Sequence, residues 1–124
     1  MKKLLDHIFF LRPMLLLPIW TIAILGVRAA DVREMASPLS IADIQAVLPD
    51  ALLMLLLTGL LYGATYIYNQ IYDVESDRQN KKLFFLTDRI ISFNSAYVLV
   101  AVLNAVSVIG AFFVNTTLGV LFLI

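Results

Sequence analysis

The sequence predicts an all-α fold, a transmembrane helical bundle with several spans. Of its 124 residues, 61% are hydrophobic and only 15% are charged, which separates the chain from soluble globular domains. Its apolar stretches of about 18 residues or more are each long enough to cross a bilayer as a helix. We expect residues 1–124 to form a single membrane domain with three full spans and the start of a fourth.

The composition also excludes several classes of function. The nine basic and nine acidic residues balance to a formal net charge of zero, so nothing in the charge predicts nucleic-acid binding. Cysteine is absent and His7 is the sole histidine of the chain. A disulfide framework, a thiolate metal site, a histidine metal site and a Ser-His catalytic pair are therefore not expected within one chain.

The first apolar segment covers residues 8–27 and is broken only by Arg12-Pro13. Its length of roughly 20 residues suits one bilayer crossing. A cleaved signal peptide is the competing interpretation, since Lys2 and Lys3 would form its basic end. Polar residues, Arg12 among them, interrupt the region that is apolar in a signal peptide, which favours a retained transmembrane helix.

Residues 28–50 form a polar connection in which a short helix is expected. Ser40-Ile-Ala-Asp43 has the pattern of a capping box, and apolar residues at helical spacing would let this helix lie along the membrane surface. Pro49 is then expected to end the helix, and Asp50 to cap the next one.

The second span is the charge-free stretch 51–68. No glycine or proline follows Gly63 in this segment, so the helix is expected to continue through Asp77. Such a helix would cross the apolar core of the bilayer and emerge into the polar layer.

The third span begins after residue 90, with Thr87 or Ser92 as its N-cap. Residues 90–124 carry no charge and are too long for a single crossing. We therefore expect a turn at Asn115-Thr116-Thr117 and the first part of a fourth span after it. Because the chain ends inside an apolar run, the membrane domain is expected to be incomplete at its C-terminus.

Basic residues near the spans predict the orientation. Acidic residues outnumber basic ones in the first connection, whereas the N-terminus and the second connection are rich in Lys and Arg. We expect an integral, multi-pass protein of the cell (inner) membrane, with its N-terminus and residues 69–77 on the cytoplasmic side. The basic residues on that side are Lys2, Lys3, Arg12, Arg78, Lys81, Lys82 and Arg89.

A polar stripe follows the second span directly. Asn69, Asp73 and Asp77 are four residues apart, so on a helix they lie on one face. Their amide and carboxylate oxygens suit Mg²⁺, which binds through one or two carboxylates, waters and substrate phosphates. A metal held there can stabilise a diphosphate as its bond to carbon breaks. The basic residues that would attract the diphosphate come next: Arg78, Lys81 and Lys82.

A plainer interpretation of the stripe remains open. Asp73 and Asp77 have the spacing of ordinary surface residues, and they could form no more than the solvated end of a helix.

The stripe and its surroundings resemble the UbiA superfamily of intramembrane prenyltransferases. The stretch from Asn69 to Arg78, Asn-Gln-Ile-Tyr-Asp-Val-Glu-Ser-Asp-Arg, is similar to that family's first Asp-rich motif, N-D-x-x-D-x-x-x-D. Arg12-Pro13 resembles the Arg-Pro of the family's first helix, and residues 80–92 resemble the loop that follows the motif.

The resemblance implies a bundle of about nine spans, of which this chain is similar to the first third. It implies Mg²⁺-dependent transfer of a prenyl group from a polyprenyl diphosphate to an aromatic or other lipid-forming acceptor, within the membrane and among its lipids. By position, the implied catalytic and metal-binding residues are Asn69, Asp73 and Asp77. The implied candidates for diphosphate binding are Arg78, Lys81 and Lys82.

The chain departs from the family pattern in three places. Gln70 stands where the family usually has Asp, which removes one carboxylate from the motif. Residues 83–88 replace a loop that usually contains Arg-Pro, which weakens the assignment of the substrate. A second Asp-rich motif, expected several helices later, is not among the 124 residues, so we do not expect them to be active alone.

Two other classes of function compete with the enzyme. The first is a small non-catalytic membrane subunit whose acidic helix end binds a partner or a divalent cation. The second is a cation channel, which is the weaker hypothesis because the acidic face lies at one end of an aromatic span. The main hypothesis is the N-terminal portion of a UbiA-type prenyltransferase.

Overall fold

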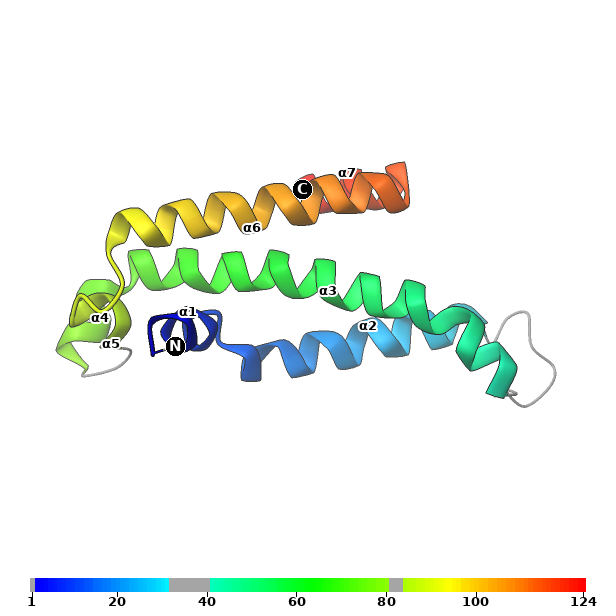
Figure 1. The fold of residues 1–124 in the computed structure, drawn as a ribbon, viewed down its shortest axis with the longest axis horizontal. Coiled ribbons are helices and arrows are strands. Elements are labelled where there is room, and N and C mark those ends of the chain that lie inside the picture. Colours follow the sequence, from blue (N-terminus) through cyan, green and yellow to red (C-terminus); the bar gives the residue numbers. More distant parts are fainter. Residues whose placement is uncertain (1, 32–40, 81–83) are drawn as a thin grey trace.

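The computed structural model describes residues 2–31, 41–80 and 84–124, and the regular structure of these residues is entirely helical (Figure 1). In chain order the elements are α1 (Lys2–Phe10), the 3-10 helix η1 (Pro13–Leu15), α2 (Leu16–Asp31), α3 (Ile41–Tyr72), α4 (Val74–Gln79), α5 (Phe84–Thr87), α6 (Phe93–Val114) and α7 (Thr116–Leu123). Among the described residues, three segments are long and apolar enough to cross a membrane: Leu4–Gly26, Leu48–Tyr72 and Phe93–Val114. The predicted all-α fold with three apolar spans is confirmed.

The long helices run alternately in opposite directions (Figure 1). Helix α2 leads away from the N-terminal helix, α3 returns, α6 leads away again and α7 turns back. As a result α1, the last turns of α3, α4 and α5 all lie at one end of the bundle, which we call the α4 end. The N-terminal helix and residues 69–77 therefore share one end, as the distribution of basic residues predicts.

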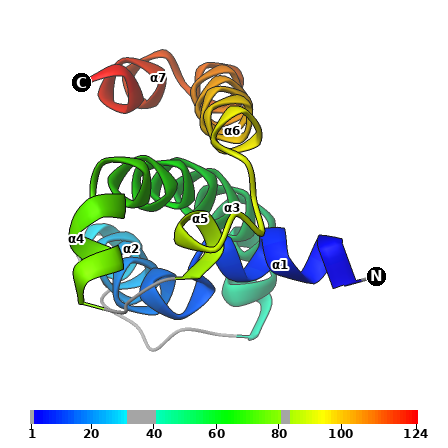
Figure 2. The same ribbon diagram turned by 90° about the vertical axis from the view of Figure 1, so that its left-hand side faces the viewer.

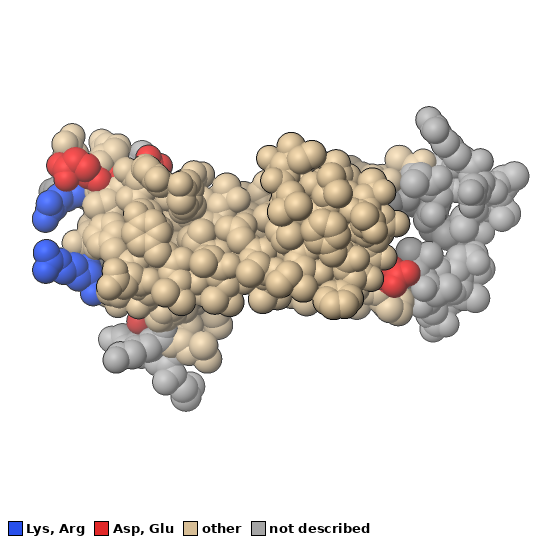
Figure 3. Space-filling view, turned by 90° about the horizontal axis from the view of Figure 1, so that it is seen from above, with Lys and Arg blue, Asp and Glu red and all other residues tan. Residues whose placement is uncertain are grey.

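Charged side chains lie near the ends of the bundle. On the face shown in Figure 3, Lys, Arg, Asp and Glu lie close to its two ends, and the broad middle carries none of them. An apolar middle between charged ends matches the layers of a bilayer, whose hydrocarbon core excludes charge.

The first apolar segment is bent at Arg12-Pro13, where the sequence interrupts its apolar run. Arg12 has a left-handed backbone conformation (φ 53°), and Pro13 follows as the first residue of η1. Proline disfavours helical geometry in the residue before it and offers no N–H, so the helix stops here. Helix α1 consequently lies across the direction of α2: it is seen end-on in Figure 1 and from the side in Figure 2.

Helix α3 is continuous through Pro49, which lies inside it. The predicted short surface helix, its end at Pro49 and the cap at Asp50 are therefore wrong, while Ser40 lies outside the described residues. A helix tolerates an internal proline by bending away from the ring. Figure 1 shows the first turns of α3 set at an angle to the rest.

The predicted boundaries of the third span are confirmed. Ser92 is the N-cap of α6, and its side chain accepts a hydrogen bond from the Ser95 backbone N–H at 3.1 Å. The expected turn falls at Asn115, whose backbone is extended (φ −163°) between α6 and α7. Its side-chain oxygen accepts a hydrogen bond from the Thr117 backbone N–H at 2.7 Å and so caps α7.

The hydrophobic core lies largely at the α4 end. Phe10 at the end of α1 is completely buried, and its ring lies 5.8 Å from that of Phe85 in α5, measured between centroids. The buried residues of this cluster come from α1, α3, α5, α6 and the turn before α6: Phe10, Ala64, Ile67, Ile71, Phe85, Leu86, Ile91, Ala96 and Leu103. The short elements at this end are thus held to the spans by packing.

Nearer the middle, small residues bring the spans together. A Cβ on Gly110 of α6 would lie 2.6 Å from the Leu57 side chain of α3, and one on Gly59 of α3 would lie 3.3 Å from the Trp20 ring of α2. Trp20 also donates a hydrogen bond from its indole to the Leu55 carbonyl at 2.9 Å. Close packing of small residues and interhelical hydrogen bonds are the main attractions between helices in lipid.

We expect Gly110→Val to destabilise the bundle by about 1–3 kcal/mol, because the added methyl groups overlap Leu57. Denaturant unfolding in detergent, followed by circular dichroism, measures the loss. Gly26→Val is the matched control, since a Cβ on Gly26 meets nothing within 4 Å. Equal losses in the two variants would contradict close packing at Gly110.

Candidate functional site

The predicted stripe spans a bend between two helices. Helix α3 ends at Tyr72 and α4 begins at Val74, so the expectation of one helix through Asp77 is wrong. Asp73 itself is the bend (φ −85°, ψ 1°), and Figure 2 shows α4 turned across the end of α3. Beyond the bend, Val74 packs against the buried cluster of the α4 end.

Backbone hydrogen bonds nevertheless keep the stripe in register. The Asp73 N–H donates to the Asn69 carbonyl at 2.9 Å, and the Asp77 N–H donates to the Asp73 carbonyl at 2.8 Å. Each of the three residues is therefore one hydrogen-bonded turn beyond the last, in spite of the bend. Asn69 and Asp73 are exposed and Asp77 is half-buried. The three oxygen-bearing side chains thus lie on successive turns at the polar end of an apolar helix.

The donor set is incomplete for a metal centre by itself. Within the described ranges, no three His, Cys, Asp or Glu side chains are grouped so that they could hold a metal ion. Asp73 and Asp77 offer two carboxylates and Asn69 one amide oxygen, which are the hard ligands that Mg²⁺ takes together with waters and phosphates. The chemistry of the set fits Mg²⁺, with coordination positions left for other ligands.

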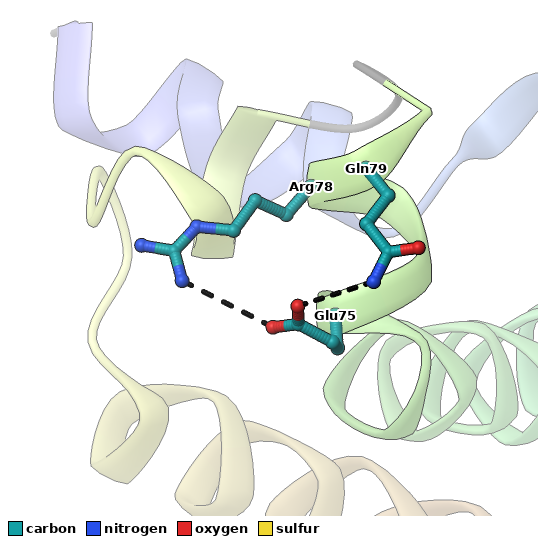
Figure 4. A network of polar contacts seen from close by, with 3 residues as sticks. All are labelled: Glu75, Arg78 and Gln79. Carbon is teal, nitrogen blue, oxygen red and sulfur yellow. Dashed lines mark hydrogen bonds and ion pairs between the residues drawn. The ribbon is translucent and has the colours of Figure 1, made fainter.

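The cationic part of the site is described only for Arg78. Its guanidinium lies 4.0 Å from the Glu75 carboxylate, which also accepts a hydrogen bond from Gln79 at 3.3 Å (Figure 4). The side chains of Arg78 and Glu75 are each 71% exposed, so the ion pair is weak. Lys81 and Lys82 lie outside the described residues.

The apolar part of the loop after α4 folds into the core. Phe85 and Leu86 of α5 are buried, and the Ile91 N–H donates to the Phe85 carbonyl at 3.0 Å. Helix α5 is therefore a packed element at the α4 end, close to the start of α6. Residues 83–88, the part of the loop that departs from the family pattern, include this packed turn.

Two residues of α3 have a role that the sequence interpretation missed. Gln70 is buried (4% exposed) and its amide nitrogen donates to the Phe10 carbonyl at 3.1 Å and to the Tyr66 carbonyl at 3.2 Å. The Tyr66 hydroxyl donates to the Leu15 carbonyl at 3.1 Å. Both residues donate hydrogen bonds to backbone carbonyls of the first apolar segment. The break at Arg12-Pro13 was the sequence signal, because a broken helix leaves carbonyl groups that need donors from elsewhere.

Comparison with known proteins places this helical membrane protein in a family. Residues 35–124, well over half of the chain, match the model of the UbiA prenyltransferase family. No curated protein and no solved structure matches the chain. The chain belongs to the UbiA prenyltransferase family, and it is a multi-pass membrane protein of a family of prenyltransferases. The match includes the stripe and the loop after it, but Arg12-Pro13 lies before the matched residues.

We expect the exposed end of the stripe to be dispensable for folding. Asp73 makes no side-chain capping hydrogen bond to α4, so Asp73→Asn should change the free energy of unfolding by no more than about 0.5 kcal/mol. Phe10→Ala, at a completely buried position, should lower the free energy of unfolding by about 3–5 kcal/mol. Denaturant unfolding in detergent measures both variants. A comparable loss from Asp73→Asn would assign that carboxylate a structural role.

Proposed function

We propose that Asn69, Asp73 and Asp77 bind Mg²⁺ and, through it, the diphosphate of a polyprenyl diphosphate, whose prenyl group is transferred to an aromatic or other lipid-forming acceptor. The observation that carries this proposal is the placement of these side chains. Asn69 and Asp73 are exposed on successive turns where an apolar span reaches the polar end of the bundle. Membership of the prenyltransferase family supports the same chemistry.

Asp73 and Asp77 contribute the negative charge of the proposed site, and Asn69 contributes a neutral oxygen. Mg²⁺ bound there would neutralise charge on the diphosphate as it leaves carbon. The three residues form one side of the proposed site and leave coordination positions of Mg²⁺ for further ligands. Backbone hydrogen bonds link Asn69 to Asp73 and Asp73 to Asp77, and these bonds fix the spacing of the three residues along the helix end.

Arg78 is proposed to bind the diphosphate directly, together with Lys81 and Lys82. Its exposed ion pair with Glu75 contributes little to stability, so the guanidinium can turn to a phosphate at small cost. Arginine suits this role because its planar group donates two parallel hydrogen bonds to phosphate oxygens.

The prenyl chain is proposed to lie among the apolar spans, which carry exposed hydrophobic side chains along much of their length. This places the reacting carbon at the border between the hydrocarbon and polar layers. The predominance of basic residues near this end supports a cytoplasmic location at the cell membrane.

Asp73→Ala is expected to lower Mg²⁺-dependent transfer from a radiolabelled prenyl diphosphate by about 100-fold or more, because it removes a carboxylate that holds the metal. The assay uses the full protein in membranes, with and without chelation of Mg²⁺. Glu75→Ala is the control, since Glu75 is an exposed carboxylate two residues away that lies off the stripe. Undiminished transfer by Asp73→Ala would overturn the proposed function.

Arg78→Ala is expected to raise the KM for the prenyl diphosphate at least about 10-fold with a smaller change in kcat, because the charged hydrogen bonds of the guanidinium to the diphosphate are lost. Steady-state kinetics over a range of prenyl diphosphate concentrations measures both constants. Arg89→Ala removes the same charge from an exposed position in the loop before α6. An equal rise in KM for both variants would point to a general effect of positive charge instead.

A further inference from the structure

We propose that Gln70 is a positioning residue and not a ligand of the cation. Its hydrogen bond to the Phe10 carbonyl, which we call the latch, holds α1 across the α4 end. Gln70 follows Asn69 directly, yet the two side chains face different surroundings. Asn69 is exposed, whereas Gln70 is 4% exposed and turned toward the N-terminal segment. Of the first two residues of the motif, Asn69 therefore faces outward, where the cation is proposed to bind, and Gln70 faces inward, toward α1.

The latch has a specific backbone target. Helix α1 ends at Phe10, and the last carbonyls of a helix have no partner within it. Pro13, three residues on, has no N–H to offer the Phe10 carbonyl, and the left-handed Arg12 turns the chain away. The Gln70 amide donates to this carbonyl at 3.1 Å, from a residue 60 positions away in the sequence.

Both hydrogens of the Gln70 amide are used in this arrangement. The first is donated to Phe10, and the second to the Tyr66 carbonyl at 3.2 Å, one turn earlier in α3. An ionised aspartate at this position has no hydrogen to donate, so it would face these carbonyl oxygens without a bond. This gives a physical reason for glutamine where the family usually has Asp.

A second contact one turn away completes the attachment. The Tyr66 hydroxyl donates to the Leu15 carbonyl at 3.1 Å, so two turns of α3 hold the two sides of the break at Arg12-Pro13. Phe10 is completely buried against the cluster that contains Ile67 and Ile71. The latch therefore orients α1 and fixes the helix end that carries Asn69 and Asp73. Its geometry is independent of the proposed function, whereas its effect on the cation site rests on that function.

Hydrogen–deuterium exchange of the full chain in lipid nanodiscs tests the latch, without Mg²⁺ or diphosphate. Gln70→Met keeps the length of the side chain and removes its donor, and it should speed exchange of the α1 amides about 10-fold. Gln70→His places a ring N–H near the lost amide and should restore most of the protection. Gln79→Met, at an exposed glutamine, should leave α1 unchanged. Exchange in α6 should be the same in all variants.

Unchanged exchange of α1 in Gln70→Met would overturn the latch, and so would faster exchange in α6 to the same extent, which indicates general unfolding. If Gln70→His did not restore the protection of the α1 amides, the shape of the Gln70 side chain and not its hydrogen bond would hold α1, which would also overturn the proposal. Because cysteine is absent, spin labels on Leu5→Cys and Asn94→Cys give an independent distance between α1 and α6, which should broaden in Gln70→Met. These results do not depend on transfer by Asp73 variants, so the latch and the proposed function can fail separately.

Discussion

Satisfying backbone carbonyls inside an apolar environment is the constraint on which this structure depends. Wherever a helix breaks in or near a membrane, its freed carbonyl groups need donors from the protein. The break at Arg12-Pro13 frees the carbonyls of Phe10 and neighbouring residues, and α3 supplies the donors through Gln70 and Tyr66. At the turn at Asn115 the group that needs a partner is a donor: the Asn115 side-chain oxygen accepts a hydrogen bond from the Thr117 N–H and so caps the next helix locally. The hydrogen bonds at the Arg12-Pro13 break join the first apolar segment to α3 and so constrain the tertiary structure. The hydrogen bond at Asn115 joins residues two positions apart and does not.

The α4 end is also where the buried cluster lies. This cluster joins residues from α1, α3, α5, α6 and the turn before α6, so several segments of the chain meet at one place. The exposed oxygens of Asn69 and Asp73 stand on the outside of this packed end. Exposed side chains such as these are positioned by the buried residues of the same helix end, which here are Ile67, Gln70 and Ile71.

The bend at Asp73 determines where the residues after α3 lie. The bend turns α4, which carries Asp77 and Arg78, across the end of α3 (Figure 2). With the bend, Val74 packs against the core, and the continued hydrogen bonds from Asn69 to Asp73 to Asp77 preserve the turn-by-turn spacing. The acidic stripe and the basic residue after it therefore stay at the end of the bundle, where the proposed diphosphate site needs them.

The sequence by itself determined the spans, the two candidate caps of the third span (Thr87 and Ser92), the turn at residues 115–117, and the shared end of α1 and residues 69–77. These follow from hydrophobic length, local hydrogen bonding and charge near the spans, all of which act over a few residues. The resemblance of residues 69–78 to an Asp-rich motif predicted the family. Only the tertiary structure decided the course of α3 through Pro49, the bend at Asp73 and the inward role of Gln70. The inward role of Gln70 depends on what packs against the helix from elsewhere in the chain, and local spacing carries no record of that. Its partner Phe10 is 60 residues away, and the spacing of the motif places Gln70 beside the proposed ligands. Pro49 marks a possible helix end in the sequence, but a helix can also accept a proline by bending, and this choice is visible only in the structure.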